Sequence, residues 1–134
     1  GGTALRFAAD DVRPMGRTAA GVQGIRVDGG RAVSLGVLPR GPEADATLLA
    51  VTASGTARRF PAAELPVAGR GGKGLKVGED GLVACVPAAD LHLVVAGEAT
   101  ILRAADVPEG RRTGRGTALD GPVGPGAAAE VAPA

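Results

Sequence analysis

Short apolar runs separated by glycine, proline and aspartate recur along the chain and predict β-strands. The clearest are residues 48–52 (Leu-Leu-Ala-Val-Thr), 82–86 (Leu-Val-Ala-Cys-Val) and 91–96 (Leu-His-Leu-Val-Val-Ala), each of strand length. Residues 32–38 form a fourth such run, with glycines on either side of its first half. No run has the length and 3.6-residue period of a packed helix, and 23 glycines and 10 prolines disfavour long helices. The pattern therefore predicts an all-β protein.

Two kinds of connection separate these strands. Ser54-Gly55 and Ala96-Gly97 each stand between two strand-like runs, as the turns of β-hairpins do. Three short segments, residues 8–11, 62–65 and 104–107, each have room for one helical turn and no more. We therefore expect hairpins joined by short acidic connectors and glycine-rich loops.

One phrase of six residues occurs three times, at Gly2–Phe7, Gly55–Phe60 and Gly97–Leu102. The copies are 53 residues apart (from position 7 to 60) and then 42 (from 60 to 102). A period of this size is typical of propeller blades and related arrays, in which each unit buries its apolar face against its neighbours. We expect propeller-like repeats with about three blade units, at about residues 1–38, 47–86 and 91–120. Each phrase is followed at a constant distance by an acid (Asp11, Glu64, Asp106) and then by an arginine-glycine turn (Arg17, Arg70, Arg112).

These units predict a single partial propeller domain over residues 1–120. Residues 39–46 read as a flexible linker, and they account for most of the difference between the two spacings. From residue 121 onward the chain is rich in Pro, Gly and Ala, so we expect 121–134 to be a flexible, disordered C-terminal tail. Gly1-Gly2 occupies a hairpin-turn position with no strand before it, so we expect the chain to enter its first unit in mid-blade.

The composition excludes several classes of function. With one histidine, His92, and one cysteine, Cys85, the chain cannot build a structural zinc site or an internal disulfide, and we expect no metal. His92 lies between Leu91 and Leu93, which predicts a half-buried strand residue rather than a member of a catalytic triad. There is no tyrosine or tryptophan for stacking on single-stranded bases, and no apolar run long enough to span a membrane. We expect no catalytic residue and no cofactor in this chain, and a reduced cytoplasmic setting.

Basic residues gather in one cluster per unit, although the formal net charge is only +1. Each cluster lies in or beside a glycine-rich loop and contains at most one acid. If the units fan around an axis, the clusters line one curved positive rim that suits the evenly spaced phosphates of duplex DNA. Arginine donates paired hydrogen bonds to phosphate, and glycine lets backbone N–H groups approach it. The predicted DNA-binding residues are Arg13, Arg17, Arg26, Arg58, Arg59, Arg70, Gly71, Gly72, Lys73, Gly74, Lys76, Arg111, Arg112 and Arg115.

The glycine-rich loops also resemble those of a known family. Residues 11–26 (Asp-Val-Arg-Pro-Met-Gly-Arg-Thr-Ala-Ala-Gly-Val-Gln-Gly-Ile-Arg) closely resemble the repeat in C-terminal domains of bacterial type IIA topoisomerase A subunits, in DNA gyrase and topoisomerase IV. Residues 49–60 with Arg70–Gly74 are similar to the neighbouring repeat, and Arg112–Gly116 to a third. The resemblance covers about residues 1–119.

The resemblance implies a β-pinwheel, a propeller-like disc of blades that binds, bends and wraps double-stranded DNA around a basic rim and positions it for strand passage. It implies two protein partners, the catalytic core of the same A subunit together with the ATPase B subunit, in the cytoplasm and associated with the nucleoid. ATP and Mg²⁺ are used elsewhere in the implied ATP-dependent holoenzyme. The tyrosine that cleaves DNA in this family is not in this chain, which has no tyrosine.

One departure bears on the choice within the family. Gyrase A subunits carry a heptapeptide close to Gln-Arg-Arg-Gly-Gly-Lys-Gly, and Arg70–Gly74 matches its last five positions. Ala68 and Gly69 replace its glutamine and first arginine, which favours a topoisomerase IV-like subunit slightly over gyrase. The alternative function is a propeller-like protein-interaction module without DNA binding. It needs an exposed apolar or aromatic anchor, and the two phenylalanines, Phe7 and Phe60, lie at a repeat position that we expect to be buried.

Overall fold

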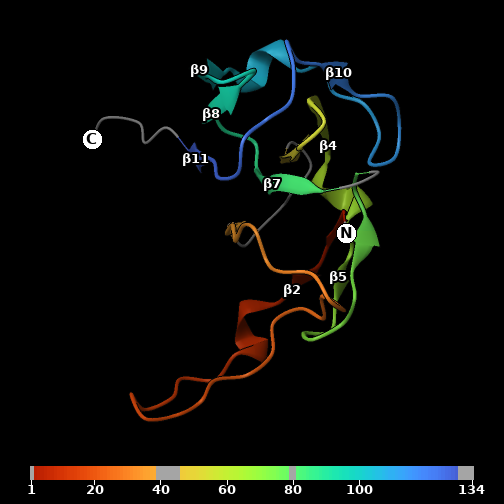
Figure 1. The fold of residues 1–134 in the computed structure, drawn as a ribbon. Coiled ribbons are helices and arrows are strands. Elements are labelled where there is room, and N and C mark those ends of the chain that lie inside the picture. Colours follow the sequence, from red (N-terminus) through yellow and green to blue (C-terminus); the bar gives the residue numbers. More distant parts are fainter. Residues whose placement is uncertain (1, 39–45, 79–80, 130–134) are drawn as a thin grey trace, which may run out of the picture.

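The structure is a computed structural model that describes residues 2–38, 46–78 and 81–129. Within these residues all regular structure is β-strand or single-turn 3-10 helix, which confirms the all-β prediction (Figure 1). The strands are β1 (Thr3–Ala4), β2 (Arg6–Phe7), β3 (Thr47–Thr52), β4 (Thr56–Pro61), β5 (Val67–Ala68), β6 (Leu75–Lys76), β7 (Leu82–Pro87), β8 (Leu91–Val95), β9 (Glu98–Leu102), β10 (Thr117–Ala118) and β11 (Ala128–Ala129). The 3-10 helices are η1 (Ala9–Asp11), η2 (Ala62–Glu64) and η3 (Ala104–Asp106).

The second unit forms the central sheet of the molecule, with strand order β10-β4-β3-β7. Its hairpin β3–β4 turns at Ser54-Gly55, as expected, and Gly55 has φ 101°. That backbone conformation is readily reached only by glycine, and a Cβ there would also collide with the carbonyl of Gly121. The three 3-10 helices lie at equivalent positions, so the repeat spacing of 53 and 42 residues is confirmed.

The third unit forms a three-stranded sheet of order β11-β8-β9, whose hairpin turns at Ala96-Gly97. Its third strand comes from the segment that we expected to be a flexible tail. Residues 128–129 pair with β8, and Val123 is buried and bridges Val95. The packed fold therefore passes the expected boundary at residue 120 and reaches Ala129, because the backbone of β11 pairs with the edge of β8 and the Val123 side chain is buried. The rest of the predicted tail, residues 130–134, lies outside the described residues.

The first unit is much less regular than the other two. Its strands β1 and β2 pair only with β6 and β5 of the second unit, and residues 12–38 contain no strand. The strand expected at residues 32–38 is therefore wrong. Its counterpart in the second unit, β7, pairs with β3, and the described residues of the first unit contain no strand corresponding to β3. The linker expected at residues 39–46 falls outside the described residues except for Ala46.

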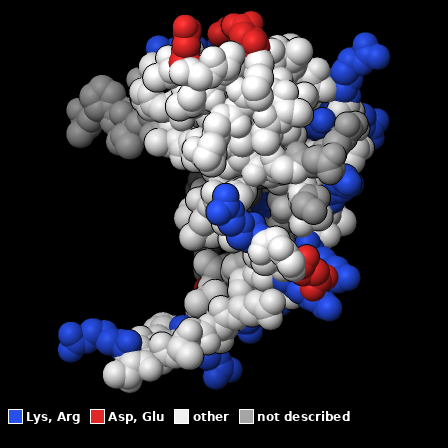
Figure 2. All heavy atoms as spheres, in the orientation of Figure 1, with Lys and Arg blue, Asp and Glu red and all other residues white. Residues whose placement is uncertain are grey.

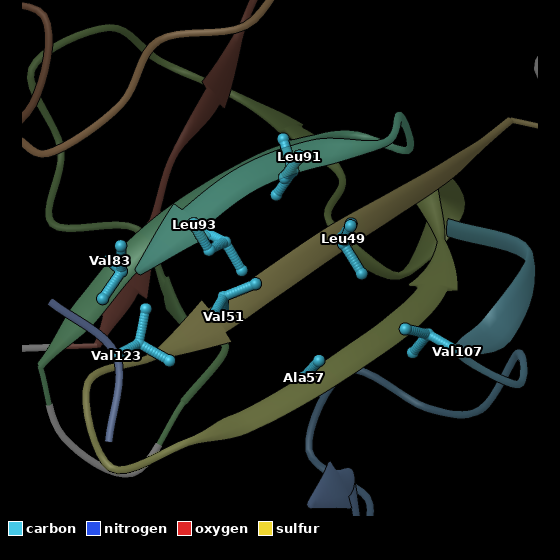
Figure 3. Close-up of a cluster of buried hydrophobic side chains, with 8 residues drawn as sticks. All are labelled: Leu49, Val51, Ala57, Val83, Leu91, Leu93, Val107 and Val123. Atoms are coloured by element: carbon cyan, nitrogen blue, oxygen red, sulfur yellow. The ribbon is translucent and has the colours of Figure 1, made fainter. Parts of the chain in front are cut away.

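The central sheet is buried on both faces, which explains the unbroken apolar run of β3. Leu49 and Val51 belong to the cluster that fills the space against β8 of the third unit (Figure 3). Leu48 and Ala50 point the other way and pack with Phe60 in a second cluster. A strand covered on both faces needs apolar side chains at successive positions rather than at alternate ones.

At both junctions the following unit adds a strand to the unit before it, in the same register. β6 of the second unit pairs antiparallel with β1 of the first, and β10 of the third unit pairs antiparallel with β4 of the second. β5 pairs in parallel with β2, and the bridge between Arg59 and Glu109 repeats that pairing one unit later. At these two junctions a strand of the following unit therefore pairs with the phrase of the unit before it.

Candidate nucleic-acid interface

Basic side chains are visible over several parts of the molecule (Figure 2). Figure 2 shows them over the loop before β10, over the loop that joins β5 to β6, and on the segment after η1, which protrudes from the rest. Acidic side chains gather at another end, over β9 and η3. The two loops carry the second and third basic clusters of the sequence, so these two clusters lie on the same side of the molecule.

The arginines that open these loops hold the units together. Arg70 donates from Nε to the carbonyl of Asp11 (3.0 Å) and from Nη1 to that of Gln23 (2.8 Å). Arg112 makes the same pair of bonds one unit later, from Nε to the carbonyl of Glu64 (3.0 Å) and from Nη1 to that of Lys76 (2.6 Å). Both arginines use their planar fork on two backbone carbonyls, and we call this arrangement the arginine clamp.

Two further arginines, Arg6 and the predicted Arg59, also donate to backbone carbonyls of the protein. Arg6 donates to the carbonyls of Ala62 and Leu65, and Arg59 donates to that of Val107 at 2.8 Å. Because Leu65 and Val107 are equivalent residues, this bond too is repeated at both junctions. The Arg6 role was missed from the sequence, although Arg6 and Arg59 hold the same place in the repeated phrase.

The prediction that Arg58 contacts DNA is wrong, because its side chain is not exposed. Its side chain is buried, its Nη1 donates to the carbonyl of Arg112, and its Nε has no partner among the described residues. The Arg58 side chain points inward, toward the carbonyl of Arg112 in the third unit. A buried guanidinium is not available to a phosphate.

The glycines of the second cluster are required by the loop itself. Gly71 and Gly74 have φ of 84° and 80°, a region that only glycine reaches readily. A Cβ on Gly74 would collide with the backbone of Ala4, and one on the equivalent Gly116 would collide with Thr56. Gly72 accepts a hydrogen bond at its carbonyl from the backbone N–H of Arg26 (2.8 Å). These glycines thus let the loop lie directly on the preceding unit.

Asp28 joins the first two basic clusters. Its carboxylate lies 2.9 Å from Nε of Arg26 and 3.5 Å from Nζ of Lys73. All three side chains are more than half exposed (58%, 56% and 65% for Arg26, Asp28 and Lys73). An exposed ion pair of this kind contributes little to stability, so both cations can be shared with an incoming phosphate.

The remaining predicted cations are exposed and make no bond within the described part of the chain. Arg31, which was not among the predicted residues, is also exposed and makes no such bond. Its exposure in the structure is the only signal that adds it to this group. Such side chains can turn toward an anion without giving up an existing bond. The predicted residues of this kind are Arg13, Arg17, Lys76, Arg111 and Arg115.

Few other chemical groups stand out in residues 2–38, 46–78 and 81–129. No set of three or more His, Cys, Asp or Glu there could hold a metal ion, and the only helices there are single turns, too short to cross a membrane. Burial raises the pKa of the Cys85 thiol to about 11, which fits a packing role. His92 is exposed on β8, not half-buried as expected, because the side chains of β8 alternate and those of Leu91 and Leu93 face the core.

Comparison with known proteins gives a consistent match. The family model described as "DNA gyrase C-terminal domain, beta-propeller" matches residues 1–39 and 46–83. The DNA gyrase A subunit of Deinococcus deserti is 38% identical over 124 residues, which are 85% of this chain and 15% of that protein.

Two further gyrase A subunits match shorter stretches. That of Staphylococcus epidermidis is 34% identical over 117 residues (83% of this chain, 13% of that protein). That of Mycobacterium tuberculosis is 46% identical over 77 residues (55% of this chain, 9% of that protein). The chain thus spans less than a sixth of these relatives. On the repeated strand exchange, the glycine loops and the extent of the family match, this chain belongs to the DNA gyrase C-terminal domain family of β-propellers.

Proposed function

We propose that this chain is the double-stranded DNA-binding and DNA-wrapping domain of a type II topoisomerase A subunit, and that it positions DNA for strand passage. Membership of the gyrase C-terminal family supports the proposal. The observation that carries it is that Lys76, Arg111 and Arg115 stay exposed and unbonded on the side where the two loops lie, while Arg70 and Arg112 are used inside.

The mechanism is electrostatic and independent of sequence. Free lysine and arginine side chains neutralise phosphates and release their counterions. Contacts of this kind place the duplex without reading its bases. The clamps fix the spacing of successive loops, so the free cations of one unit stand at a set distance from those of the next. A duplex that follows this series has to bend.

The remaining parts of the reaction belong to the rest of the enzyme in this proposal. The catalytic core cleaves DNA, and the B subunit hydrolyses ATP with Mg²⁺. This chain supplies no catalytic residue and no cofactor site. The assembly works in the cytoplasm on the nucleoid.

The heptapeptide and the relatives favour different types of topoisomerase. The substitutions at Ala68 and Gly69 in the heptapeptide favour a topoisomerase IV-like subunit, whereas the relatives named above are all gyrase A subunits. A supercoiling assay of the A subunit that contains this domain, together with its B subunit, separates the two. Net negative supercoiling indicates gyrase, and relaxation and decatenation alone indicate topoisomerase IV.

The DNA-binding proposal is tested with two matched variants of the full chain. Arg111→Ala combined with Arg115→Ala removes two free cations, so the slope of log affinity against log salt falls by about 2. Arg112→Ala removes one cation next to them but breaks a clamp, so it lowers the free energy of unfolding by roughly 1–2 kcal/mol. Binding is measured by fluorescence anisotropy over a salt series and unfolding by urea titration. Unchanged binding of the double variant refutes the proposal.

The alternative function, a protein-interaction module, requires an exposed aromatic or apolar anchor, and neither phenylalanine is fully exposed. Phe60 is fully buried, and Phe7 is half-buried. The exposed apolar side chains that remain are aliphatic, and several lie in the first unit.

A further inference from the structure

An acidic side chain, that of Asp28, lies between the first and second basic clusters. Its Oδ1 is 2.9 Å from Nε of Arg26, and its Oδ2 is 3.5 Å from Nζ of Lys73. Lys73 belongs to the loop between β5 and β6, which carries the match to the heptapeptide. One carboxylate therefore uses its two oxygens on cations that come from two different units.

Backbone hydrogen bonds hold the segment before Asp28 against this loop. The N–H of Gly71 donates to the carbonyl of Gly24 (2.7 Å), and the N–H of Arg26 donates to that of Gly72 (2.8 Å). Both bonds join backbone to backbone, so they place the two segments side by side whatever the long side chains do. The distance between the carboxylate and the loop is therefore set by the fold.

A tight turn then carries the carboxylate at the surface. The N–H of Gly30 donates to the carbonyl of Val27 and closes the turn. Gly29, its third residue, has φ 77°, a conformation that glycine adopts readily. Asp28 is the second residue of the turn, and its side chain is 56% exposed. It is thus presented to solvent beside the cations that it pairs with.

The ion pairs of Asp28 contribute little to the fold. Arg26 and Lys73 are also more than half exposed, and water and salt screen ion pairs of this kind. Asp90 is different, because it also accepts the backbone N–H of Ala104. The main consequence of Asp28 is therefore on the charge that the surface presents to a ligand, since it cancels one of two positive charges.

We propose that Asp28 is a built-in competitor of DNA phosphate, which weakens the hold of the second basic cluster on the duplex. This role rests on the proposed function, because it concerns the strength of DNA binding at the same site. Carboxylate and phosphate oxygens accept hydrogen bonds from the same guanidinium and ammonium groups. A phosphate that binds Arg26 or Lys73 has to displace the carboxylate and is then repelled by its charge.

The first test compares the native full chain with Asp28→Asn, which keeps the size of the side chain and removes its charge. We expect Asp28→Asn to bind a duplex of fixed length about 3- to 10-fold more tightly at low salt, because a repulsive charge near the phosphates is lost. The slope of log affinity against log salt should steepen by about 1, because one more cation is free to neutralise a phosphate. Fluorescence anisotropy over a salt series measures both, and urea titration should show nearly unchanged stability.

Two further variants locate the effect. Asp106→Asn is the matched control, with the same charge change in η3, at the end of the molecule over which acidic side chains gather (Figure 2). It should change the affinity by less than about 2-fold, because salt screens a charge that lies away from the basic clusters. In a Lys73→Gln background the gain from Asp28→Asn should shrink, because one of the two cations that the carboxylate occupies is gone.

The outcomes separate this role from the proposed function. If Arg111→Ala with Arg115→Ala weakens DNA binding while Asp28→Asn does not tighten it, Asp28 is no competitor and the proposed function stands. An equal gain from Asp106→Asn, or a gain from Asp28→Asn that is the same without Lys73, also overturns the role of Asp28. If neither the native chain nor any variant binds duplex DNA, the proposed function fails and the role of Asp28 fails with it.

Discussion

The first and second units share a phrase of sequence but have very different structures. In the second unit the phrase becomes β4, paired on both sides within a four-stranded sheet and buried on both faces. In the first unit it becomes two strands of two residues each, which pair only with the short strands β6 and β5 of the second unit. The difference follows from strand pairing, because β4 lies between β3 and β10, whereas the described residues of the first unit contain no counterpart of β3.

The largest expected effect compares the two phenylalanines at the end of the phrase. Phe60 is fully buried, so Phe60→Ala should lower the free energy of unfolding by about 3–5 kcal/mol. Phe7 is half-buried, so Phe7→Ala should cost only roughly 1 kcal/mol. Urea titration followed by circular dichroism measures both. Equal losses would show that the first unit is packed as well as the second.

A middle-sized effect compares two glycines with the same backbone conformation. Gly21 and Gly74 have φ of 85° and 80°, so an alanine at either is strained by roughly 1 kcal/mol. Only at Gly74 does the new Cβ meet a neighbour, the backbone of Ala4. Gly74→Ala should therefore cost about 1–3 kcal/mol more than Gly21→Ala. Thermal unfolding of the two variants measures the difference. If the two variants are equally stable, the loop does not lie on the first unit.

The smallest expected effect is a pH dependence of stability that the third unit should show and the second should not. The N–H of Ala104 donates to Asp90, and Arg103 bonds to it as well, and these bonds lower the pKa of the Asp90 carboxyl below its ordinary value. A lowered pKa in the folded state means that the stabilisation is present above the ordinary pKa and is lost as the pH falls through the folded value. The second unit has Leu48 at this position and lacks the effect.

Hydrogen exchange of the Ala104 amide, measured from neutral to acid pH, tests this prediction. Its protection should fall in acid in the native chain. Asp90→Asn should remove the pH dependence and leave the amide less protected throughout. A native chain whose Ala104 protection does not change with pH would contradict the assignment.

The sequence predicts most of this fold because the repeat places a turn, a strand and a short helix at constant spacing. The hairpin turns at Ser54-Gly55 and Ala96-Gly97 and the three 3-10 helices follow from that spacing alone. Pairing between units does not follow, since nothing local shows that β10 belongs to the sheet of β4. For the same reason the sequence predicts a strand at residues 32–38 that the structure lacks, and it does not predict that Val123 and β11 pair with β8.

The candidate interface is predicted less well than the fold. Charge and loop position select segments with exposed basic side chains, such as those of Arg111 and Arg115. The same criteria also select Arg58, Arg70 and Arg112, whose guanidinium groups bond to backbone carbonyls. An arginine that binds a carbonyl and one that binds a phosphate occupy the same kind of loop. Only the position of the neighbouring unit separates them.

Because a strand of one unit pairs with the unit before it, the central sheet can be completed only after the next unit has been synthesised. The sheet of β3 and β4 stays open at one edge until β10 has left the ribosome, although more than fifty residues lie between β4 and β10. At about 5–20 residues per second, this wait lasts several seconds. During that time a nascent chain exposes the edge of β4, so a chaperone that covers strand edges would find its substrate there.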